Sequence, residues 1–468
     1  MHFEGNNDGP TLLLVHGHPD TERVWDPVVA LLSDRFRIAR ADADSAAATL
    51  REWDGDALHV LAHGGGSAAV WRYLTQPGAS DRVASFTSAS GPAHAARHRR
   101  IADKLGLLGK RAPVAGADPV DVPVQLIVIA GDRRVSPRFY DDIGVRASRL
   151  WRRDVKGGHA TPYVLARSVT QLVDHLEGAP APRELLRAQI GRPRKAFGDT
   201  LVAVTGAASG IGRETALAFA REGADVVISD VDTAGLAETA RLVAAVGGQA
   251  FSYTVDVADA AAVEEFADQV CAEHGVPDVV VNNAGVGHAG FFLDTPAQEY
   301  DRVLDINLGG VVNGCRSFGT RLRDRGVGGH IVNVASMASY TPVNVMNAYC
   351  TSKAAVFMFS DCLRAELDSH GIGLTTICPG IIGTNIVNTT RFSLPEERSY
   401  DTEAIRHRVR RGFAVRRVGP DKVARAIVTA VKSNKPVRPV TTEAYFVYGA
   451  AHALPQAMRS AARGGNIM

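Results

Sequence analysis

The sequence has little cysteine. Its 468 residues include five cysteines, all in the second half of the chain and none in a C-x-x-C pair. This spacing excludes a disulfide framework and a cysteine-based zinc site, and it indicates small, buried apolar residues in a reducing compartment. The five residues are Cys271, Cys315, Cys350, Cys362 and Cys378.

Long apolar runs and an excess of one charge are also missing. No run of about 18 apolar residues occurs, and residues 1–8 lack the basic and then apolar regions of a signal peptide. We therefore expect a cytoplasmic protein, with membrane contact as the less favoured alternative. The formal net charge of +2 does not indicate a basic face for nucleic acid.

The sequence does have the composition of a globular protein. Hydrophobic residues make up 46% and charged residues 22% of the chain, enough to bury full cores, and the length suits two or three domains. Apolar runs alternate with helical patterns in both halves, which predicts α/β folds with mainly parallel sheets. The Pro-containing stretch 178–197 predicts a semi-rigid linker between domains at 1–177 and 198–468.

A glycine-rich turn organises the second half. Residues 205–212 follow the apolar run 201–204 and precede the helical pattern 213–222. In a strand–turn–helix unit such a turn brings the backbone close to a pyrophosphate at a helix N-terminus. Asp230 ends the next apolar run, 20 positions after Gly210, where a carboxylate can bind ribose hydroxyls. The pattern predicts a dinucleotide site, although glycines also mark ordinary turns.

Further motifs follow in order. Asn282-Asn283-Ala284-Gly285 follows an apolar run, Ser336 follows another, and Tyr349 and Lys353 stand in the segment Tyr-Cys-Thr-Ser-Lys, before Pro379-Gly380 and Thr384. With these motifs, roughly residues 198–440 resemble the short-chain dehydrogenase/reductase family, which has a Rossmann-type doubly wound parallel sheet. The resemblance implies an oxidoreductase acting on a CH–OH group. It also implies pairing through the helix that bears Tyr349 and Lys353, so we expect a homodimer or homotetramer.

The resemblance also implies a set of cofactor-binding residues. Asp256 could equally be a helix cap. Asp230 would repel a 2′-phosphate, and Ser209 and Val231 stand where NADP-binding members carry a basic residue, so we predict NAD. The expected cofactor-binding residues are Gly206, Ser209, Gly210, Ile211, Gly212, Asp230, Asp256, Val257, Asn283, Ala284, Gly285, Tyr349, Lys353, Pro379, Gly380, Ile382 and Thr384.

Four residues are the expected catalytic set. Tyr349 and Lys353 are four positions apart, so they share one face of a helix. A lysine ammonium within ~4 to 6 Å, assisted by the positive nicotinamide of NAD⁺, favours phenolate and can lower the pKa of Tyr349 by about 1 to 3 units. Tyr349 is then the expected general acid/base. From the family, Ser336 should hold the substrate oxygen and Asn307 should maintain a kink and a water near Lys353. The alternative is that these four residues are ordinary polar groups with satisfied hydrogen bonds and no catalytic role.

The stretch 385–417 corresponds to the family's substrate lid. It is rich in arginine, which we interpret either as a solvated helix face or as a clamp for an anionic handle. The arginines are Arg406, Arg408, Arg410, Arg411, Arg416 and Arg417. The tail 436–468 suits subunit packing better than membrane contact.

The first half carries a weaker resemblance. His16-Gly17-His18-Pro19, Trp25 and the segment 61–66 resemble an α/β-hydrolase of the epoxide-hydrolase kind. The nucleophile position of the elbow G-x-Nuc-x-G is Gly64, which offers no nucleophile. A rival register uses Ser67, but places it inside the following helix.

The other hydrolase positions are also depleted. Arg134 stands where the family carries its acid, although Asp132 is close by, and only His159 is in a plausible place. About 30 positions separate residues 90–92 from 123–124, too few for a helical cap. We therefore expect a degenerate, inactive module that serves as a scaffold or binding surface.

These expectations combine into one prediction. We expect an NAD(H)-dependent enzyme that interconverts a small secondary alcohol and a ketone, with an apolar substrate, no metal and an inactive hydrolase-like domain. Two alternatives stay open. The chain could be a bifunctional hydrolase-dehydrogenase, or an NAD-binding structural or regulatory protein.

Overall fold

The computed structural model divides the chain into two compact units, residues 1–194 and 195–468. It describes residues 2–91, 120–129, 147–155, 162–190, 195–383, 390–393 and 418–464. The division falls inside the stretch 178–197 that the sequence analysis assigned to a linker. Each unit has its own sheet and its own hydrophobic core.

The first unit is built on a seven-stranded sheet in the order β1-β3-β2-β4-β5-β6-β7. β1 pairs with β3 in antiparallel fashion and every other pair is parallel. A mainly parallel sheet was predicted for this half from the alternation of apolar runs with helical patterns. The strands are β1 (Phe3–Gly5), β2 (Thr11–His16), β3 (Arg37–Asp42), β4 (Leu58–His63), β5 (Val83–Ala89), β6 (Val124–Ile129) and β7 (Leu150–Val155).

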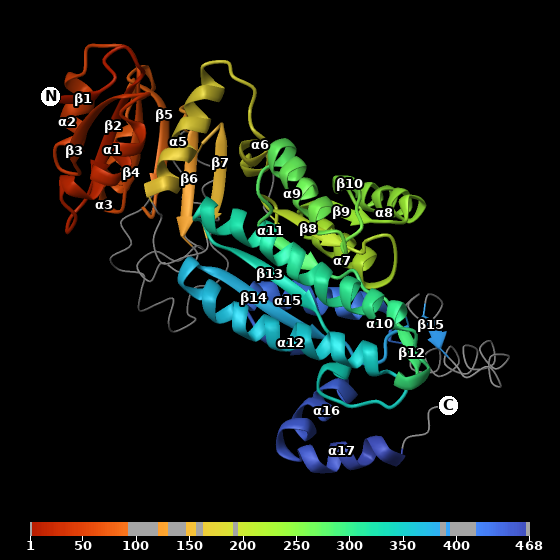
Figure 1. Cartoon of the computed structure of the whole chain (residues 1–468). Helices are drawn as coiled ribbons and strands as arrows, with labels where there is room; N and C mark the ends of the chain where they lie inside the picture. Colours follow the sequence, from red (N-terminus) through yellow and green to blue (C-terminus); the bar gives the residue numbers. More distant parts are fainter. Residues whose placement is uncertain are drawn as a thin grey trace, which may run out of the picture. The chain divides into compact units, whose positions relative to one another are not determined.

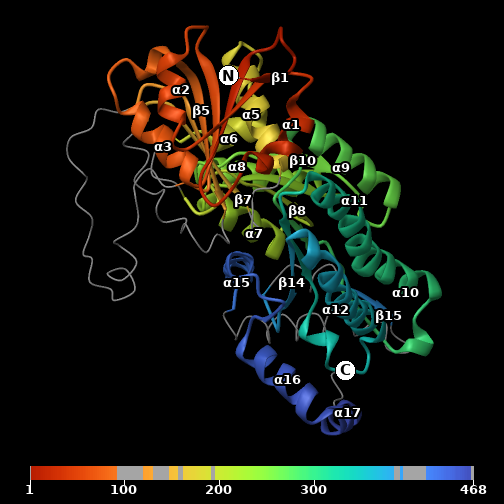
Figure 2. The ribbon, with the colours of Figure 1, turned by 90° about the vertical axis from the view of Figure 1, so that its left-hand side faces the viewer.

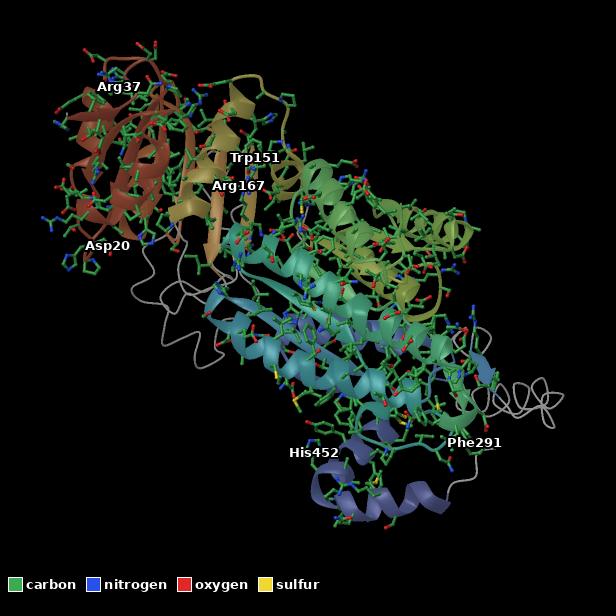
Figure 3. All side chains as sticks on the ribbon, viewed as in Figure 1. Asp20, Arg37, Trp151, Arg167, Phe291 and His452 are labelled. Atoms are coloured by element: carbon green, nitrogen blue, oxygen red, sulfur yellow. The ribbon has the colours of Figure 1, made fainter. Side chains whose placement is uncertain are left out.

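Helices flank this sheet in pairs, α1 with α5 and α2 with α3. The helix α6 also belongs to this unit, because its Leu185 is buried in a cluster with Trp151 of β7 and Leu172 of α5. Arg167 of α5, which is labelled in Figure 3, binds Glu184 of α6 at 3.0 Å. The predicted linker is therefore largely packed structure up to residue 190. The helices are α1 (Asp26–Leu32), α2 (Ala46–Glu52), α3 (Gly65–Leu74), α5 (Pro162–Leu176) and α6 (Arg183–Ala188).

The second unit contains a wholly parallel sheet in the order β10-β9-β8-β11-β13-β14-β16. Its central strands are continuous apolar runs, as expected of strands covered on both faces. The chain runs outward from β8 in both directions, so β8 and β11 mark the point where the strand order reverses. The strands are β8 (Leu201–Thr205), β9 (Asp225–Asp230), β10 (Ala250–Thr254), β11 (Val279–Asn282), β13 (Gly329–Val334), β14 (Ile372–Cys378) and β16 (Val437–Pro439).

Helices cover both faces of the second sheet (Figures 1 and 2). One core lies under α7, α8 and α15, where Phe219 and Ile427 are buried, and the other under α9, α11 and α12, where Phe318 and Val356 are buried. This confirms the predicted Rossmann-type architecture. The helices are α7 (Gly210–Arg221), α8 (Thr233–Ala245), α9 (Ala260–His274), α11 (Gly310–Arg325), α12 (Asn347–Leu367) and α15 (Pro420–Ser433).

Smaller elements complete the second unit. A two-stranded parallel sheet joins β12 to β15, and α16 and α17 pack against each other. These elements are β12 (His288–Gly290), β15 (Arg391–Ser393), α10 (Ala297–Leu304), the π-helix η6 (Asp305–Gly309), the 3-10 helix η7 (Met337–Ser339), α16 (Thr442–Ala453) and α17 (Pro455–Gly464).

Two findings concern exposure. Cys315 and Cys378 are buried and Cys271 and Cys350 half-buried, but Cys362 is exposed, so the prediction of a buried residue is wrong there. Cys362 lies on the outward face of α12, which the sequence pattern did not distinguish. Among the described residues, no helix has the length and apolarity to cross a membrane.

Candidate active site

The glycine-rich turn between β8 and α7 forms a tight backbone cradle. Gly206 and Gly210 have φ angles of +66° and +56°, in the left-handed region that favours glycine. A Cβ at Gly206 would lie 2.7 Å from Cα of Ala284, and one at Gly212 would lie 2.1 Å from the carbonyl oxygen of Gly206. Glycine is therefore required where the turn, the N-terminus of α7 and the segment at Ala284 come together. Ser209 is the N-cap residue of α7, and Ile211 packs against the core.

Asp230 lies at the end of β9, beside this turn. Its carboxylate accepts hydrogen bonds from the backbone N–H groups of Ala208, at 3.0 Å, and Asp232, at 3.1 Å. These bonds fix the carboxylate against the turn, and the side chain remains partly exposed. A polar ligand in the turn would thus meet a fixed negative charge.

The side chain of Arg213 makes hydrogen bonds around the glycine-rich turn. Its guanidinium donates to Thr239 Oγ1 at 2.9 Å, to the Gly235 carbonyl at 3.3 Å and to the Ala208 carbonyl. These bonds tie the turn to α8. The guanidinium is therefore engaged with protein acceptors beside Asp230.

Asp256 and Val257 follow β10. The Asp256 carboxylate accepts from the Ala258 N–H at 3.0 Å, and the side chain is exposed. The helix-cap alternative is wrong, because the N-cap of α9 is Asp259, which accepts from the N–H groups of Ala261 and Ala262. Val257 is buried, and its carbonyl accepts from Asn313.

Asn283, Ala284 and Gly285 pass directly across the turn. The Asn283 amide donates to the carbonyls of Thr205 and Gly206, at 3.0 and 3.1 Å. The N–H groups of Asn283 and Ala284 both donate to Thr205 Oγ1. These hydrogen bonds hold residues 283–284 against the glycine-rich turn.

Asn307 is fully buried inside the π-helix η6, between α10 and α11. Its side-chain oxygen accepts from the Val286 N–H at 2.8 Å, and its amide donates to the Val286 carbonyl and to Ser352 Oγ. A π-turn inserted between α-helices often marks a functional site. Here it joins the segment after Gly285 to α12, one residue before Lys353.

Ser336 and Tyr349 meet at the end of β13. Ser336 caps η7, where its hydroxyl accepts from the Ala338 N–H at 3.2 Å. Its side chain is also hydrogen-bonded to the phenol of Tyr349, and this bond acts to lower the pKa of Tyr349. The structure thus brings together two side chains that are 13 positions apart in the sequence.

Lys353 is buried one turn further along α12. Its ammonium donates to the Val334 carbonyl at 2.9 Å, and a Cβ at Gly285 would lie 3.4 Å from Nζ and 3.0 Å from Asn307 Oδ1. Burial lowers the pKa of Lys353 to about 8. The lysine and asparagine therefore lie against the same glycine.

The protein groups alone shift the pKa of Tyr349 in the direction opposite to the one expected beside Lys353 and NAD⁺. Burial is the largest effect and raises the pKa of Tyr349 above its ordinary value near 10. The sequence analysis predicted a decrease caused by Lys353 together with NAD⁺, but the Lys353 ammonium donates its hydrogen bond to Val334. Desolvation of the phenolate outweighs the donation from Ser336.

The segment after β14 closes this side of the site. The Pro379 carbonyl accepts from the Met337 N–H, and Gly380 lies so close to Thr441 that a Cβ would be 2.0 Å from its hydroxyl oxygen. Ile382 is buried in the core. Thr384 and the six arginines of the expected lid lie outside the described residues.

Sequence reasoning missed the small sheet beside the site. His288 of β12 is buried, and its Nε2 is hydrogen-bonded to Ser393 Oγ of β15 at 2.9 Å. The next residues of β12 hold the loop before Tyr349, because the Gly290 N–H donates to the Val345 carbonyl at 2.7 Å. Val345 has φ +62°, a rare conformation for a β-branched residue. A three-residue strand gives no periodic signal in a sequence.

In the first unit, the turn between β4 and α3 contains Gly64, the position that the sequence analysis compared with a hydrolase nucleophile. Gly64 has φ +57° and ψ −121° at the N-cap of α3, and a Cβ there would meet no atom within 4 Å. Ser67 lies inside α3, fully buried, and donates to the Ala62 carbonyl at 2.8 Å. Asp132, Arg134 and His159 lie outside the described residues.

Comparisons with known proteins agree with this geometry. A family profile described as short chain dehydrogenase matches residues 200–393. The probable oxidoreductase EphD of Mycobacterium tuberculosis is 49% identical, covering 99% of this chain and 96% of that protein. The putative oxidoreductase SadH of the same species is 35% identical over 50% of this chain and 83% of its own length.

A solved structure is similar to the second unit. A short-chain dehydrogenase/reductase of Burkholderia phymatum, determined in complex with NAD, is 26% identical with a TM-score of 0.51, and covers 56% of this chain and 94% of its own. The alignment with EphD extends over 568 positions, whereas this chain has 468 residues. About 100 positions of that alignment therefore have no residue in this chain.

Proposed function

Because the chain belongs to the short-chain dehydrogenase/reductase family of oxidoreductases, we propose that it uses NAD(H) to interconvert a secondary alcohol and a ketone. One observation carries the proposal: the side chain of Ser336 at the end of β13 is hydrogen-bonded to Tyr349, and Lys353 is buried four positions after Tyr349 on α12. A phenol, a hydroxyl and an ammonium in this order can move a proton to or from a substrate oxygen.

The glycine cradle fits a dinucleotide. Gly206, Gly212 and Gly285 each lie where a Cβ would collide with or crowd neighbouring protein atoms, so the segments around the turn can pack closely only with glycine at these positions. The N-terminus of α7 would take the pyrophosphate, and Asp230 the ribose hydroxyls. When bound, NAD supplies the acceptor for the two electrons that leave the alcohol.

The charges of the site favour NAD over NADP. A 2′-phosphate about 4 Å from the Asp230 carboxylate would meet a repulsion of about 4 kcal/mol at an effective dielectric near 20. Arg213 could offset it, but its guanidinium is bound to Ala208, Gly235 and Thr239.

The catalytic roles follow from these positions. Ser336 binds and orients the substrate oxygen, and Tyr349 holds or accepts its proton. Lys353 favours the phenolate by its charge, and Asn307 holds the segment after Gly285 against α12. Because burial raises the pKa of Tyr349, the phenol is protonated at neutral pH and suits proton donation to a ketone.

Replacing Tyr349 with phenylalanine tests the proposal. We expect Tyr349→Phe to lower NAD-linked turnover of secondary alcohols by about 10² or more, with unchanged NAD affinity. Tyr253→Phe is the matched control, since Tyr253 donates to Glu273 at the far end of α9. Turnover that survives Tyr349→Phe would refute the catalytic assignment and favour the structural or regulatory alternative.

The first unit does not support the bifunctional alternative. Ser67, the serine of the rival elbow register, is buried within α3 and bonded to the backbone. We therefore propose that this unit has no hydrolase activity and acts as a scaffold or binding module.

A further inference from the structure

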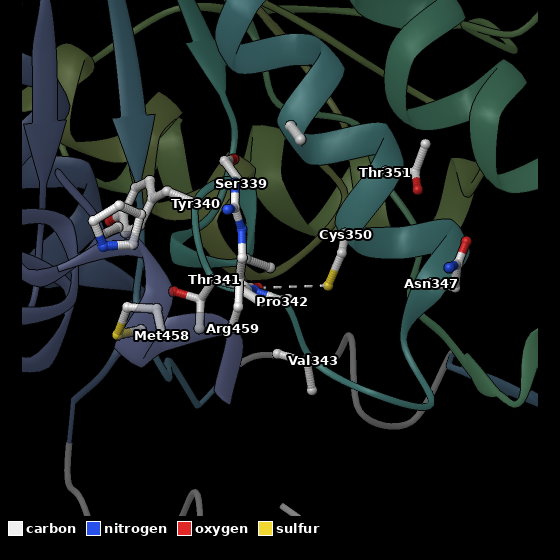
Figure 4. A pocket seen from close by; sticks show the side chains of 14 residues that line it. Ser339, Tyr340, Thr341, Pro342, Val343, Asn347, Cys350, Thr351, Met458 and Arg459 are labelled. Carbon is white, nitrogen blue, oxygen red and sulfur yellow. Dashed lines mark hydrogen bonds between the residues drawn. The ribbon is translucent and has the colours of Figure 1, made fainter. Parts of the chain in front are cut away.

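The hydroxyl group of Ser339 links two of the proposed catalytic residues. Ser339 ends η7, three positions after Ser336, and is labelled in Figure 4, where it borders a cavity beside α12. Its hydroxyl accepts from the backbone N–H of Ser336 at 3.4 Å and donates to the backbone carbonyl of Lys353 at 2.8 Å. The side chain therefore joins the end of β13 to α12. The motifs of the sequence analysis do not include it.

Ser336 and Ser339 form a reciprocal capping box around η7. While the Ser339 hydroxyl accepts from the Ser336 N–H, the Ser336 hydroxyl accepts from the N–H of Ala338 at 3.2 Å. In such a box each side chain satisfies a backbone donor at the start of the helix. A hydroxyl that accepts one hydrogen bond keeps its own proton for donation. The box therefore leaves the O–H of Ser336 available to Tyr349 or to a substrate oxygen.

Lys353 anchors this capping box on α12. It is buried, its backbone carbonyl accepts from Ser339, and its ammonium donates to the Val334 carbonyl of β13 at 2.9 Å. The two bonds thus reach the chain two positions before Ser336 and three positions after it. The bond to the carbonyl does not involve the ammonium, so it can persist whichever acceptor the ammonium takes during a reaction.

The residue after Ser336 is held by a different partner. The Met337 N–H donates to the Pro379 carbonyl, which follows β14, at 2.9 Å. This bond holds the segment toward β14 and not toward α12. The distance between the Ser336 backbone and α12 therefore depends on the bonds that Ser339 makes.

We propose that Ser339 is a positioning residue for Ser336. Its hydroxyl sets the place of the Ser336 side chain relative to Tyr349 and Lys353 on α12, so that the three side chains can act on one substrate oxygen. Ser339 acts through Ser336 and does not itself bind the substrate. The inference rests on the proposed oxidoreductase function and adds to it a residue outside the four expected catalytic positions.

A double-mutant cycle tests this role in the full-length chain. The parent protein, Ser339→Ala, Ser336→Ala and the double variant are compared in NAD-linked oxidation of isopropanol, cyclohexanol and menthol. We expect Ser339→Ala to lower kcat about tenfold and Ser336→Ala about a hundredfold, with the Kd of NAD unchanged in both. In the Ser336→Ala background, Ser339→Ala should change kcat by less than about twofold, because the hydroxyl that it positions is already gone.

Ser433→Ala is the matched control. The exposed hydroxyl of Ser433 also donates to a backbone carbonyl, that of Thr429 in α15, at 2.9 Å. This variant should change no kinetic constant. A loss of kcat on Ser339→Ala that is equally large in both backgrounds would indicate a general weakening of the fold and overturn the positioning role. A kcat that Ser339→Ala leaves unchanged would overturn it as well.

Urea unfolding of the same four proteins gives a readout that needs no substrate. The two hydroxyls of a capping box support one turn together, so removing both should lower the free energy of unfolding by less than the sum of the single removals. Additive losses would overturn the inference alone. A parent protein that binds NAD but oxidises no secondary alcohol would instead overturn the proposed function, and the positioning role with it.

Discussion

Burial disfavours the charged forms of two titratable residues on α12. Tyr349 is disfavoured as a phenolate and Lys353 as an ammonium, because desolvation raises one pKa and lowers the other to about 8. The proposed reaction therefore depends on groups whose charged forms the fold itself does not favour. The pH dependence of turnover and of stability can measure the two effects.

The first prediction concerns the pH dependence of turnover. Alcohol oxidation needs the Tyr349 phenolate, and its pKa lies above the ordinary value near 10. The kcat for oxidation should therefore rise with pH throughout the range from 7 to 10, while ketone reduction, which needs the phenol, should not. Steady-state rates in both directions check this. An oxidation rate that is flat above pH 7 would mean that the phenolate forms far more easily than the structure indicates.

The second prediction concerns the stability cost of Lys353. Its pKa falls from about 10.5 to about 8 on folding, a cost on the order of 3 kcal/mol when the lysine is charged. Lys353→Met should abolish turnover but stabilise the NAD-free protein by about 1 to 2 kcal/mol at pH 7, since the lost bond to Val334 offsets part of the gain.

The sign of the pH effect is fixed by the same shift. Between about pH 8 and 10.5, Lys353 is protonated in the unfolded chain but not in the folded protein. The free energy of unfolding, which this shift reduces below pH 8, therefore rises with pH across this range. The difference in melting temperature between Lys353→Met and the parent should be largest below pH 8 and shrink toward pH 10. A difference independent of pH would point to packing instead.

At the scale of elements, the glycine-rich turn depends on both a backbone conformation and close contacts. Gly206 and Gly247 share positive φ angles, of +66° and +79°, but only Gly206 has neighbours within 4 Å of an added Cβ. Gly247→Ala should cost about 1 to 2 kcal/mol for the left-handed backbone alone. Gly206→Ala should lower the free energy of unfolding, measured with urea, by clearly more than this, and it should also weaken the binding of NAD. Equal costs would show that Asn283 and Ala284 yield easily.

The small sheet β12–β15 provides a second prediction about elements. The His288–Ser393 bond joins the segment after Gly285 to residues 391–393. Ser393→Ala should raise the KM for the alcohol about fivefold, the effect of losing one hydrogen bond, and leave the Kd of NAD unchanged. Thr429→Ala, on the exposed side of α15, is the control. A change in NAD affinity instead would place β12 on the cofactor side.

Sequence and structure agree where the signal is local. The turn 205–212, Asp230, and Tyr349 with Lys353 depend on neighbouring strands and one helix, and apolar periodicity locates these elements. The π-turn at Asn307 and the β12–β15 pair depend on contacts between distant segments, which periodicity does not reveal. The pKa direction of Tyr349 in the protein alone differs from the expected one for the same reason, because burial depends on the tertiary fold. The interpretation of Asp256 as a helix cap was wrong because the N-cap of α9 is Asp259, three positions later.

At the scale of the whole molecule, the two units have separate cores and different relations to known proteins. The family profile lies entirely in the second unit, whereas the likeness to EphD covers 99% of the chain. In the first unit, Gly64 has φ +57° and ψ −121° at the turn before α3. Glycine adopts a positive φ without steric cost, so the residue present suits the conformation of this turn.

The last prediction follows from this separation. A fragment of residues 195–468 contains both cores of the second sheet, so it should fold, bind NAD with unchanged Kd and show Tyr349-dependent turnover. The full chain should not gain hydrolysis of esters or epoxides, and Ser67→Ala should change no rate. Comparing a panel of secondary alcohols between fragment and full chain then decides what the first unit contributes. Equal selectivity makes it an assembly element, whereas lost or altered selectivity in the fragment means that the nucleophile-free fold takes part in choosing the substrate.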